Sequence, residues 1–298
     1  MGNLAVIDVG SNAIRLVIGK VTKKGKVKRE VRLREPVRLG ADTFCDDCKI
    51  SEKNLKKTVS AFKKFKREFA QFDVAKWRVV ATSAVREAQN KDWFLKQIFK
   101  QTGLAIDIID GREEARLIKQ AVDRKWDLSK KTALIMDIGG GSVEFALCKN
   151  GRLRKIQSFK IGTVRLLKQA GRHLNSRVHL QELVYPVRSR LLQMCKDEKI
   201  EIFVGTGGNI EAMAYLKKRI LGKSPSIQIH QHELARISRV LFSQTYEQRV
   251  RQLGLRPDRA DVILPAVVIC ATVLSLLPTA HIYVPKVGLR EGALAELA

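Results

Sequence analysis

Residues 134–147 read Leu-Ile-Met-Asp-Ile-Gly-Gly-Gly-Ser-Val-Glu-Phe-Ala-Leu, and this stretch predicts how the chain folds. An apolar run ends at Asp137, three glycines follow, and a second apolar run starts at Val143. This order is typical of two strands joined by a tight turn, because glycine adopts positive φ angles without a steric clash. Three glycines also leave backbone N–H groups accessible to an anion with several oxygens. The stretch therefore predicts a phosphate-binding hairpin, with Asp137 placed to hold a divalent cation; an ordinary glycine hairpin is the alternative.

A similar hairpin is predicted near the start of the chain. Residues 4–18 read Leu-Ala-Val-Ile-Asp-Val-Gly-Ser-Asn-Ala-Ile-Arg-Leu-Val-Ile, so Asp8-Val-Gly10 aligns with Asp137-Ile-Gly139. Two such hairpins, one early in each half, suggest duplicated domains that face each other and grip a phosphate chain from both sides. The match is short, and a chance resemblance between the two stretches is the alternative.

The length and the cysteines set the class of protein. A chain of 298 residues can form two domains, which we expect at 1–124 and 125–298, with the last helix packing back on the first domain. The sequence contains no apolar run of membrane-spanning length and no signal-peptide pattern, so we expect a cytoplasmic protein. Five cysteines are an odd number, which favours reduced thiols. Cys45 and Cys48 have zinc-ligand spacing, but without a second Cys/His pair we expect an ordinary loop.

The net charge indicates an acidic partner. Lys and Arg number 56 against 30 Asp and Glu, which gives a net charge of +26. Such a field attracts polyanions, including nucleic acid, acidic lipid and inorganic phosphate chains. A helix predicted to follow Ser51 has one apolar face and carries many of these charges, at Lys53, Lys56, Lys57, Lys63, Lys64, Lys66 and Arg67. The alternative is that these side chains are simply solvated.

The rest of the chain predicts alternating strands and helices, as in a mixed α/β fold. Residues 77–81 predict a short buried strand that leads into a helix near Ser83, where small hydroxyl residues can expose N–H groups to an anion. A second glycine-rich turn, residues 205–208, lies between a predicted strand and a helix. Residues 23–26 predict a basic turn, and residues 230–232 predict a surface loop.

Taken in order, the motifs resemble those of the Ppx/GppA family of exopolyphosphatases and guanosine-pentaphosphatases, within the actin-like ATPase superfamily. The resemblance spans nearly the whole chain and depends on seven segments, residues 8–12, 81–88, 111–118, 137–144, 162–165, 205–208 and 288–292. It implies an α/β protein made of two ribonuclease-H-like (actin-like) domains with a cleft between them. It also implies hydrolysis of a terminal phosphoanhydride bond in inorganic polyphosphate, or alternatively in guanosine pentaphosphate (pppGpp).

The resemblance also implies roles for individual residues. Glu114 matches the catalytic glutamate of the family, and a carboxylate there can take a proton from an attacking water. Its simpler interpretation is an acid favoured by the helix dipole. The implied metal is Mg²⁺, with Asp137, Asp8 and Glu144 as candidate ligands. The groups expected to bind phosphate are Ser11, Asn12, Arg86, Gly139, Gly140, Gly141, Ser142, Gly207 and Gly208.

Two departures from the family pattern affect these expectations. Longer relatives carry a C-terminal helical domain of the His-Asp phosphohydrolase type, which this sequence does not include and which could bind long chains or help form a homodimer. Asn209 stands where the family more often has threonine, which puts contacts of the 205–208 turn in doubt.

The sequence leaves two other functions as alternatives. A sugar or acetate kinase of the same superfamily would need a base-binding signature, which the sequence lacks. A non-catalytic polyanion or nucleic-acid binder would use the charge alone, but no nucleic-acid-binding module is recognisable.

Overall fold

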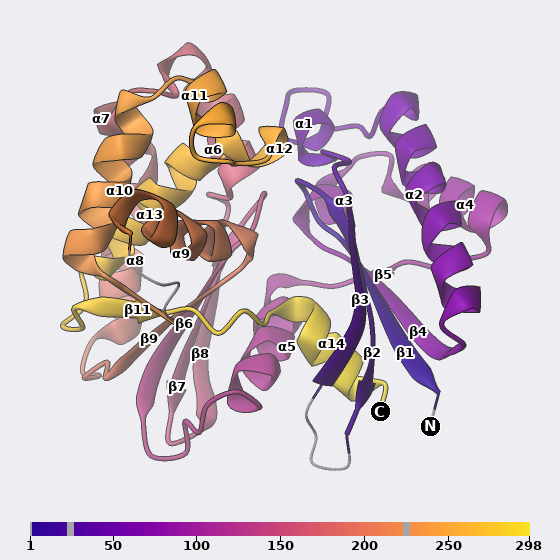
Figure 1. The fold of residues 1–298 in the computed structure, drawn as a ribbon, viewed down its shortest axis with the longest axis horizontal. Coiled ribbons are helices and arrows are strands. Elements are labelled where there is room, and N and C mark those ends of the chain that lie inside the picture. The colour runs from indigo at the N-terminus through magenta and orange to yellow at the C-terminus, as the bar shows by residue number, and fades with distance from the viewer. Residues whose placement is uncertain (1, 23–26, 223–226) are drawn as a thin grey trace. The chain divides into compact units, whose positions relative to one another are not determined.

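The computed structural model describes residues 2–22, 27–222 and 227–298, so the basic turn expected at 23–26 lies outside the described residues. The chain divides into two compact units, residues 1–124 with 287–298, and residues 125–286. Each unit has one β-sheet, and each has its own cluster of buried apolar side chains (Figure 1). Among the described residues, no helix is both long enough and apolar enough to cross a membrane.

The first unit is built on a sheet with the strand order β3-β2-β1-β4-β5. Its strands are β1 (Asn3–Val9), β2 (Ile14–Val21), β3 (Val27–Glu35), β4 (Val74–Ala81) and β5 (Asp107–Ile108). The first three form an antiparallel meander, whereas β4 runs parallel to β1 and β5 parallel to β4. The apolar residues of β1 and β2 are almost fully buried, as expected for central strands covered on both faces.

Helices pack on this sheet from distant parts of the chain. They are α1 (Gly40–Thr43), α2 (Glu52–Gln71), α3 (Ser83–Glu87), α4 (Lys91–Thr102), α5 (Gly111–Asp123) and α14 (Leu289–Glu296). Helix α2 begins after Ser51, whose hydroxyl accepts from the Asn54 N–H at 3.3 Å, and it buries the apolar face that the sequence predicted. Helix α14 packs against α5, where a Cβ at Gly292 would overlap the Leu117 backbone. The end of the chain thus completes the first unit (Figure 1).

The second unit repeats the strand order of the first. Its sheet runs β10-β11-β9-β6-β7-β8, with β6 (Thr132–Ile138), β7 (Val143–Lys149), β8 (Arg152–Phe159), β9 (Ile202–Thr206), β10 (Gln228–His230) and β11 (His281–Tyr283). The β6-β7-β8 meander is antiparallel, β9 runs parallel to β6, and β11 runs parallel to β9. The order β8-β7-β6-β9-β11 therefore corresponds to β3-β2-β1-β4-β5, and β10 adds an antiparallel edge strand.

The second unit is more helical than the first. Its helices are α6 (Thr163–Ala170), the 3₁₀ turn η1 (Gly171–His173), α7 (Arg177–Val184), α8 (Pro186–Cys195), α9 (Gly208–Leu221), α10 (Gln231–Ser243), α11 (Tyr246–Arg251), α12 (Pro257–Ala260) and α13 (Ile263–Leu274). Helix α13 is apolar on nearly all sides and packs against α6, α7, α9 and α10. A helix with that composition belongs in a core, which is where it lies.

Two local predictions were wrong. The strand expected to be buried over residues 77–81 is the end of the longer β4, and only its last three residues are buried. Trp77 is 49% exposed and packs its ring on Phe69, with centroids 5.7 Å apart, because this end of β4 projects past the core. The loop expected at residues 230–232 is instead the end of β10 and the start of α10, since His230 pairs across the sheet edge with His281.

Candidate functional site

The turn between β1 and β2 is held by backbone hydrogen bonds and by its side chains. The Gly10 N–H donates to the Ala13 carbonyl at 3.2 Å, which closes the turn. Asn12 Oδ1 accepts from Arg38 Nε at 2.8 Å, and the Ser11 hydroxyl lies 3.1 Å from the Ser83 hydroxyl. Ser11 and Asn12 are both buried, so their positions are fixed by neighbours from three elements. The predicted phosphate-binding residues of this turn are therefore preorganised.

Asp8 lies opposite Arg15 on the neighbouring strand of the first sheet. The two residues are direct partners in the β1–β2 register, and Arg15 Nη1 is 3.2 Å from Asp8 Oδ2. Asp8 is buried, so this guanidinium neutralises a carboxylate that is largely removed from water. Asp8 is therefore a carboxylate whose charge a guanidinium already balances.

Arg86 is anchored at the end of the short helix α3. Its Nη1 atom donates to the Ile109 carbonyl at 2.6 Å, which leaves the rest of the guanidinium for another acceptor. Within the described residues, no carboxylate forms an ion pair with Arg86. A guanidinium that is held by one edge and has an uncompensated charge is well suited to a phosphate group.

Helix α5 separates the roles of its two adjacent glutamates. Asp110 caps the helix by accepting from the N–H groups of Arg112 and Glu113 at 2.9 and 2.8 Å. The Glu113 carboxylate takes two hydrogen bonds from Arg116, at 2.7 and 2.8 Å, and the first of these contacts is the main reason that the pKa of Glu113 is lowered. Glu114 points to the other side and is only 6% exposed. Glu113 is thus used in a surface ion pair, and Glu114 is the buried acid at this helix start.

The C-terminal helix α14 brings a second buried charge pair to the first sheet. Glu291 accepts from Arg32 at 2.8 Å and from Arg29 at 3.2 Å. Burial raises the pKa of Glu291, but Arg290 and Arg32 outweigh that effect and hold it below its usual range. Burial also lowers the pKa of Arg290, with Arg15 as the next cause. The family resemblance included residues 288–292 as a motif but implied no role for them. The signal for a role is the adjacent Arg290 and Glu291 among small residues at the start of a helix.

The glycine turn of the second unit is bound through its carbonyl groups. The Gly139 carbonyl accepts from Thr163 N at 3.1 Å, the Gly140 carbonyl from Val164 N at 2.8 Å, and the Gly141 carbonyl from Arg165 Nε at 2.9 Å. A Cβ at Gly162 would overlap the backbone of Gly140 and Gly141, so the turn and the start of α6 approach as closely as backbones can. The Gly139 N–H donates to the Ser142 carbonyl at 3.1 Å and closes the turn, so among the described residues the N–H groups of Gly140 and Gly141 are the ones that remain for an anion.

Asp137 and Glu144 form a pair of carboxylates on adjacent strands. They are direct partners in the β6–β7 register, and oxygens of the two side chains lie within 4.8 Å of each other. Thr206 Oγ1 donates to Asp137, and the Ser158 hydroxyl donates to Glu144 at 2.8 Å. Glu144 is 1% exposed. Because two close carboxylates repel each other unless a proton or cation lies near, this pair fits a hard cation such as Mg²⁺.

The turn after β9 contacts the glycine turn through Asn209. Gly207 has φ +91°, and a Cβ there would lie 3.2 Å from Asp137 Oδ1, so only glycine suits this position. Asn209 is buried, donates to Thr163 Oγ1 at 3.3 Å, and accepts from Arg259. The departure from the usual threonine therefore creates a link between Gly207–Gly208, α6 and α12. Sequence reasoning missed both Asn209 and Arg259, because their spacing of 50 residues gives no local signal.

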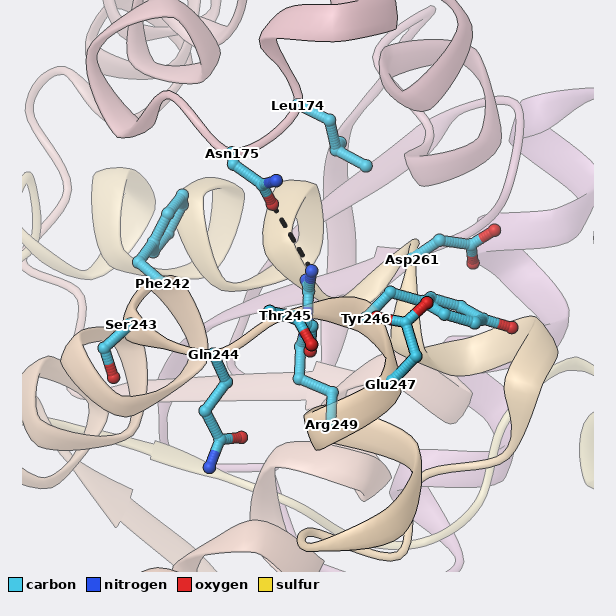
Figure 2. Close-up of a pocket in the computed structure, with 10 residues that line it drawn as sticks. All are labelled: Leu174, Asn175, Phe242, Ser243, Gln244, Thr245, Tyr246, Glu247, Arg249 and Asp261. Carbon is cyan, nitrogen blue, oxygen red and sulfur yellow. Dashed lines mark hydrogen bonds between the residues drawn. The ribbon is translucent and has the colours of Figure 1, made fainter.

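A separate pocket of about 490 Å³ lies in the second unit around Arg249 (Figure 2). Arg249 Nη2 donates to Asn175 Oδ1 at 3.3 Å, the bond drawn in the figure, and Nε donates to the Thr245 carbonyl at 3.3 Å. Burial lowers the pKa of Arg249, and the nearby carboxylates Asp261 and Glu247 oppose this. No predicted site residue lines the pocket. Arg249 thus ties α11 to the segment before α7, which is a structural role.

The cysteine pair Cys45 and Cys48 lies after α1. Each thiol lies within hydrogen-bond distance of a backbone carbonyl, Cys45 Sγ 2.7 Å from Asp42 O and Cys48 Sγ 2.8 Å from Cys45 O. Both are free thiols. These local contacts suit the ordinary loop that the sequence predicted.

The family model described as "Ppx/GppA phosphatase family" matches residues 17–298. The chain belongs to the Ppx/GppA phosphatase family. The resemblance drawn from the motifs is therefore confirmed, as is the predicted class of enzyme, a phosphohydrolase that acts on phosphoanhydride bonds.

Solved structures confirm the predicted fold of this Ppx/GppA chain. An exopolyphosphatase from Cytophaga hutchinsonii is 26% identical and superposes with a TM-score of 0.91, with 99% of this chain and 97% of that chain covered. The Ppx/GppA family member of Aquifex aeolicus is 24% identical with a TM-score of 0.80, over 99% and 97% of the two chains. The actin-like arrangement of two α/β domains, each with its own sheet, is the fold of this family.

A longer relative shows the family domain in another context. A bifunctional 3-dehydroquinate synthase/phosphatase from Fusobacterium nucleatum subsp. nucleatum is 26% identical over 98% of this chain. The chain spans 46% of the length of that relative.

Proposed function

We propose that this Ppx/GppA chain is an exopolyphosphatase, which releases terminal phosphate from inorganic polyphosphate with Mg²⁺. The observation that carries the proposal is the close pair formed by Asp137 and the buried Glu144, beside a turn whose Gly140 and Gly141 N–H groups donate to no other group among the described residues. The name of the C. hutchinsonii relative, an exopolyphosphatase, supports the same substrate class.

In this proposal Glu114 is the general base. It takes the proton of the water that attacks the terminal phosphorus, while the phosphate chain one unit shorter leaves. Two features of the first unit support the choice. The Asp110 cap fixes the start of α5, and Arg116 engages the neighbouring Glu113 in a surface ion pair.

Asp137 and Glu144 are the proposed Mg²⁺ ligands. A bound Mg²⁺ would neutralise charge that develops on the phosphate oxygens. The hydroxyl groups of Thr206 and Ser158 orient the two carboxylates, as hydrogen bonds to metal ligands generally do. Asp8 is the weakest of the predicted ligands, because Arg15 already balances its charge.

The remaining predicted residues are proposed to hold phosphate groups. In the second unit these are the N–H groups of Gly140 and Gly141, the Ser142 side chain, and the turn at Gly207 and Gly208. Gly139 would only shape the turn, because its N–H donates to the Ser142 carbonyl. In the first unit they are Ser11, Asn12 and Arg86. Each belongs to a turn or helix start, and hydrogen bonds from other elements hold several of these segments in place, which favours binding without reorganisation.

The alternative substrate is guanosine pentaphosphate, which presents the same terminal phosphoanhydride bond. Phosphate release should be measured from polyphosphate, guanosine pentaphosphate and ATP, side by side and with Mg²⁺. We expect polyphosphate to be hydrolysed fastest. Faster release from guanosine pentaphosphate would replace the proposed substrate, and release from none of the three would refute the proposal. The cytoplasmic location and the option of a homodimer stay predictions.

A further inference from the structure

A second pocket of the second unit is lined by positive and neutral polar groups. It has a volume of about 400 Å³, within the range of small-molecule pockets, and it is built from α7, α8, α10 and α13, which pack next to one another. Its polar lining consists of Arg177, Gln181, Tyr185, Arg188, Gln231, Ser238, Thr272 and Ser275. None of these residues belongs to the turns assigned to catalysis.

Arg177 and Arg188 give this pocket two uncompensated charges. No acidic residue lines it, and across residues 2–22, 27–222 and 227–298 neither guanidinium forms an ion pair. The pocket around Arg249 differs, because Glu247 and Asp261 line it as well. Two guanidinium groups without carboxylates attract a compact anion, and their planar N–H pairs match the oxygens of a phosphate group.

The neutral lining adds donors and one aromatic face. Ser238 is buried, and Gln181 and Gln231 also line the pocket. Tyr185 is 68% exposed, and the Arg188 guanidinium carbon lies 5.9 Å from the centre of its ring. A large exposed ring held near a cation offers a surface on which a planar base can stack.

We propose that this pocket binds a small polyphosphorylated ligand through Arg177 and Arg188, as a site separate from the catalytic carboxylates. Two sources share this chemistry: an inorganic phosphate oligomer, and a nucleotide di- or triphosphate. Tyr185 distinguishes these two ligands, because only a nucleotide has a base that can stack on its ring. The assignment is independent of the proposed hydrolysis, since it uses none of its residues.

The test is calorimetric titration of the full chain with tripolyphosphate and, separately, with ADP, in EDTA so that metal-dependent turnover does not interfere. Arg188→Glu reverses one charge of the pocket. Arg190→Glu is the matched control, because Arg190 lies on the same helix but does not line the pocket. We expect wild type to show a binding event that Arg188→Glu weakens by about tenfold or more and that Arg190→Glu leaves within about twofold.

Equal affinities of wild type and Arg188→Glu for both ligands would overturn the assignment, as would equal losses in the two variants. If Arg188→Glu does not fold, as judged by circular dichroism, Arg177→Gln replaces it with the same expectation. Tyr185→Ala identifies the source: weaker binding of ADP alone indicates a nucleotide, and unchanged binding of both ligands indicates an inorganic phosphate oligomer. Phosphate release is scored separately, so failure of the exopolyphosphatase proposal does not change these outcomes.

Discussion

The two glycine-containing turns occupy the same place in two sheets of matching strand order, yet the partners of their aspartates have opposite charge. Asp8 lies opposite Arg15 in the first unit, whereas Asp137 lies opposite Glu144 in the second. The first pair joins a carboxylate to a guanidinium, and the second brings two carboxyl groups within 4.8 Å of each other. A duplicated hairpin can therefore serve two purposes: one copy pairs its aspartate with a cationic side chain, and the other pairs it with a second acid, which suits a metal ion.

The turns also differ in what holds them. The first is fixed through the side chains of Asn12, bound to Arg38, and Ser11, close to Ser83, and through the Ser11 carbonyl, which accepts from the Gly40 N–H at 2.8 Å. The second is fixed through three successive carbonyl groups, which α6 and Arg165 bind. The closest approach of backbone to backbone, between Gly162 and the turn at Gly140 and Gly141, therefore belongs to the turn with three glycines.

In this comparison the first unit supplies the catalytic base, Glu114 on α5, rather than a metal ligand. Glu114→Gln keeps the size of the side chain but cannot accept a proton, so we expect phosphate release to fall about 100-fold or more. Glu113→Gln is the matched control, because it removes ion pairs with Arg116 and Arg78 and should stay within a few-fold of wild type. The reverse ranking of the two variants in the same phosphate-release assay would move the base to Glu113.

The difference in backbone contact predicts a difference in stability. Gly162→Ala would place a Cβ into the backbone of Gly140 and Gly141, so we expect it to lower the free energy of unfolding by about 1–3 kcal/mol. Gly10→Ala would place a Cβ 3.2 Å from the Ala13 carbonyl oxygen, which needs only a small shift and should cost less. Urea denaturation of both variants measures the difference, and equal losses would mean that the two turns tolerate side chains alike.

The smallest effect concerns the basic helix α2 of the first unit. Lys64 pairs with Glu35 at 2.7 Å and Lys66 donates to the Thr102 carbonyl, but the lysines at 53, 56, 57 and 63 are exposed. A long polyphosphate can contact many such groups, so raising the salt concentration should weaken its binding a few-fold more than that of tripolyphosphate. Apparent affinities at about 50 and 200 mM salt test this. Equal salt sensitivity for the two lengths would mean that the lysines are merely solvated.

The sequence was sufficient for the features that depend on local pattern. Apolar runs that flank glycines predicted both hairpins, and the periodic phenylalanines of residues 55–72 predicted the buried face of α2. The opposite partners of Asp8 and Asp137 were also within reach, because each partner lies seven residues later in its hairpin, at Arg15 and Glu144. That spacing predicts a direct cross-strand neighbour once the turn length is known.

The features that could not be predicted from the sequence depend on contacts between distant segments. Glu291 meets Arg29 and Arg32 across about 260 residues, a separation at which no periodicity applies. The buried link from Asn209 to Arg259 likewise depends on how α9 and α12 pack. The exposed Trp77 was wrongly placed in the core because strand composition does not reveal where a strand leaves the sheet.

The most direct test of this account is the Mg²⁺ dependence of phosphate release from polyphosphate in Asp137→Asn and Asp8→Asn. Asp137→Asn removes one of the two close carboxyl groups, so the Mg²⁺ concentration for half-maximal release should rise by about tenfold or more, because Mg²⁺ strongly prefers anionic oxygen ligands. Asp8→Asn should lower stability by leaving Arg15 without its partner but should leave the Mg²⁺ requirement within about twofold. An unchanged requirement in Asp137→Asn, or an equal rise in both variants, would contradict the assignment of the cation to the second unit.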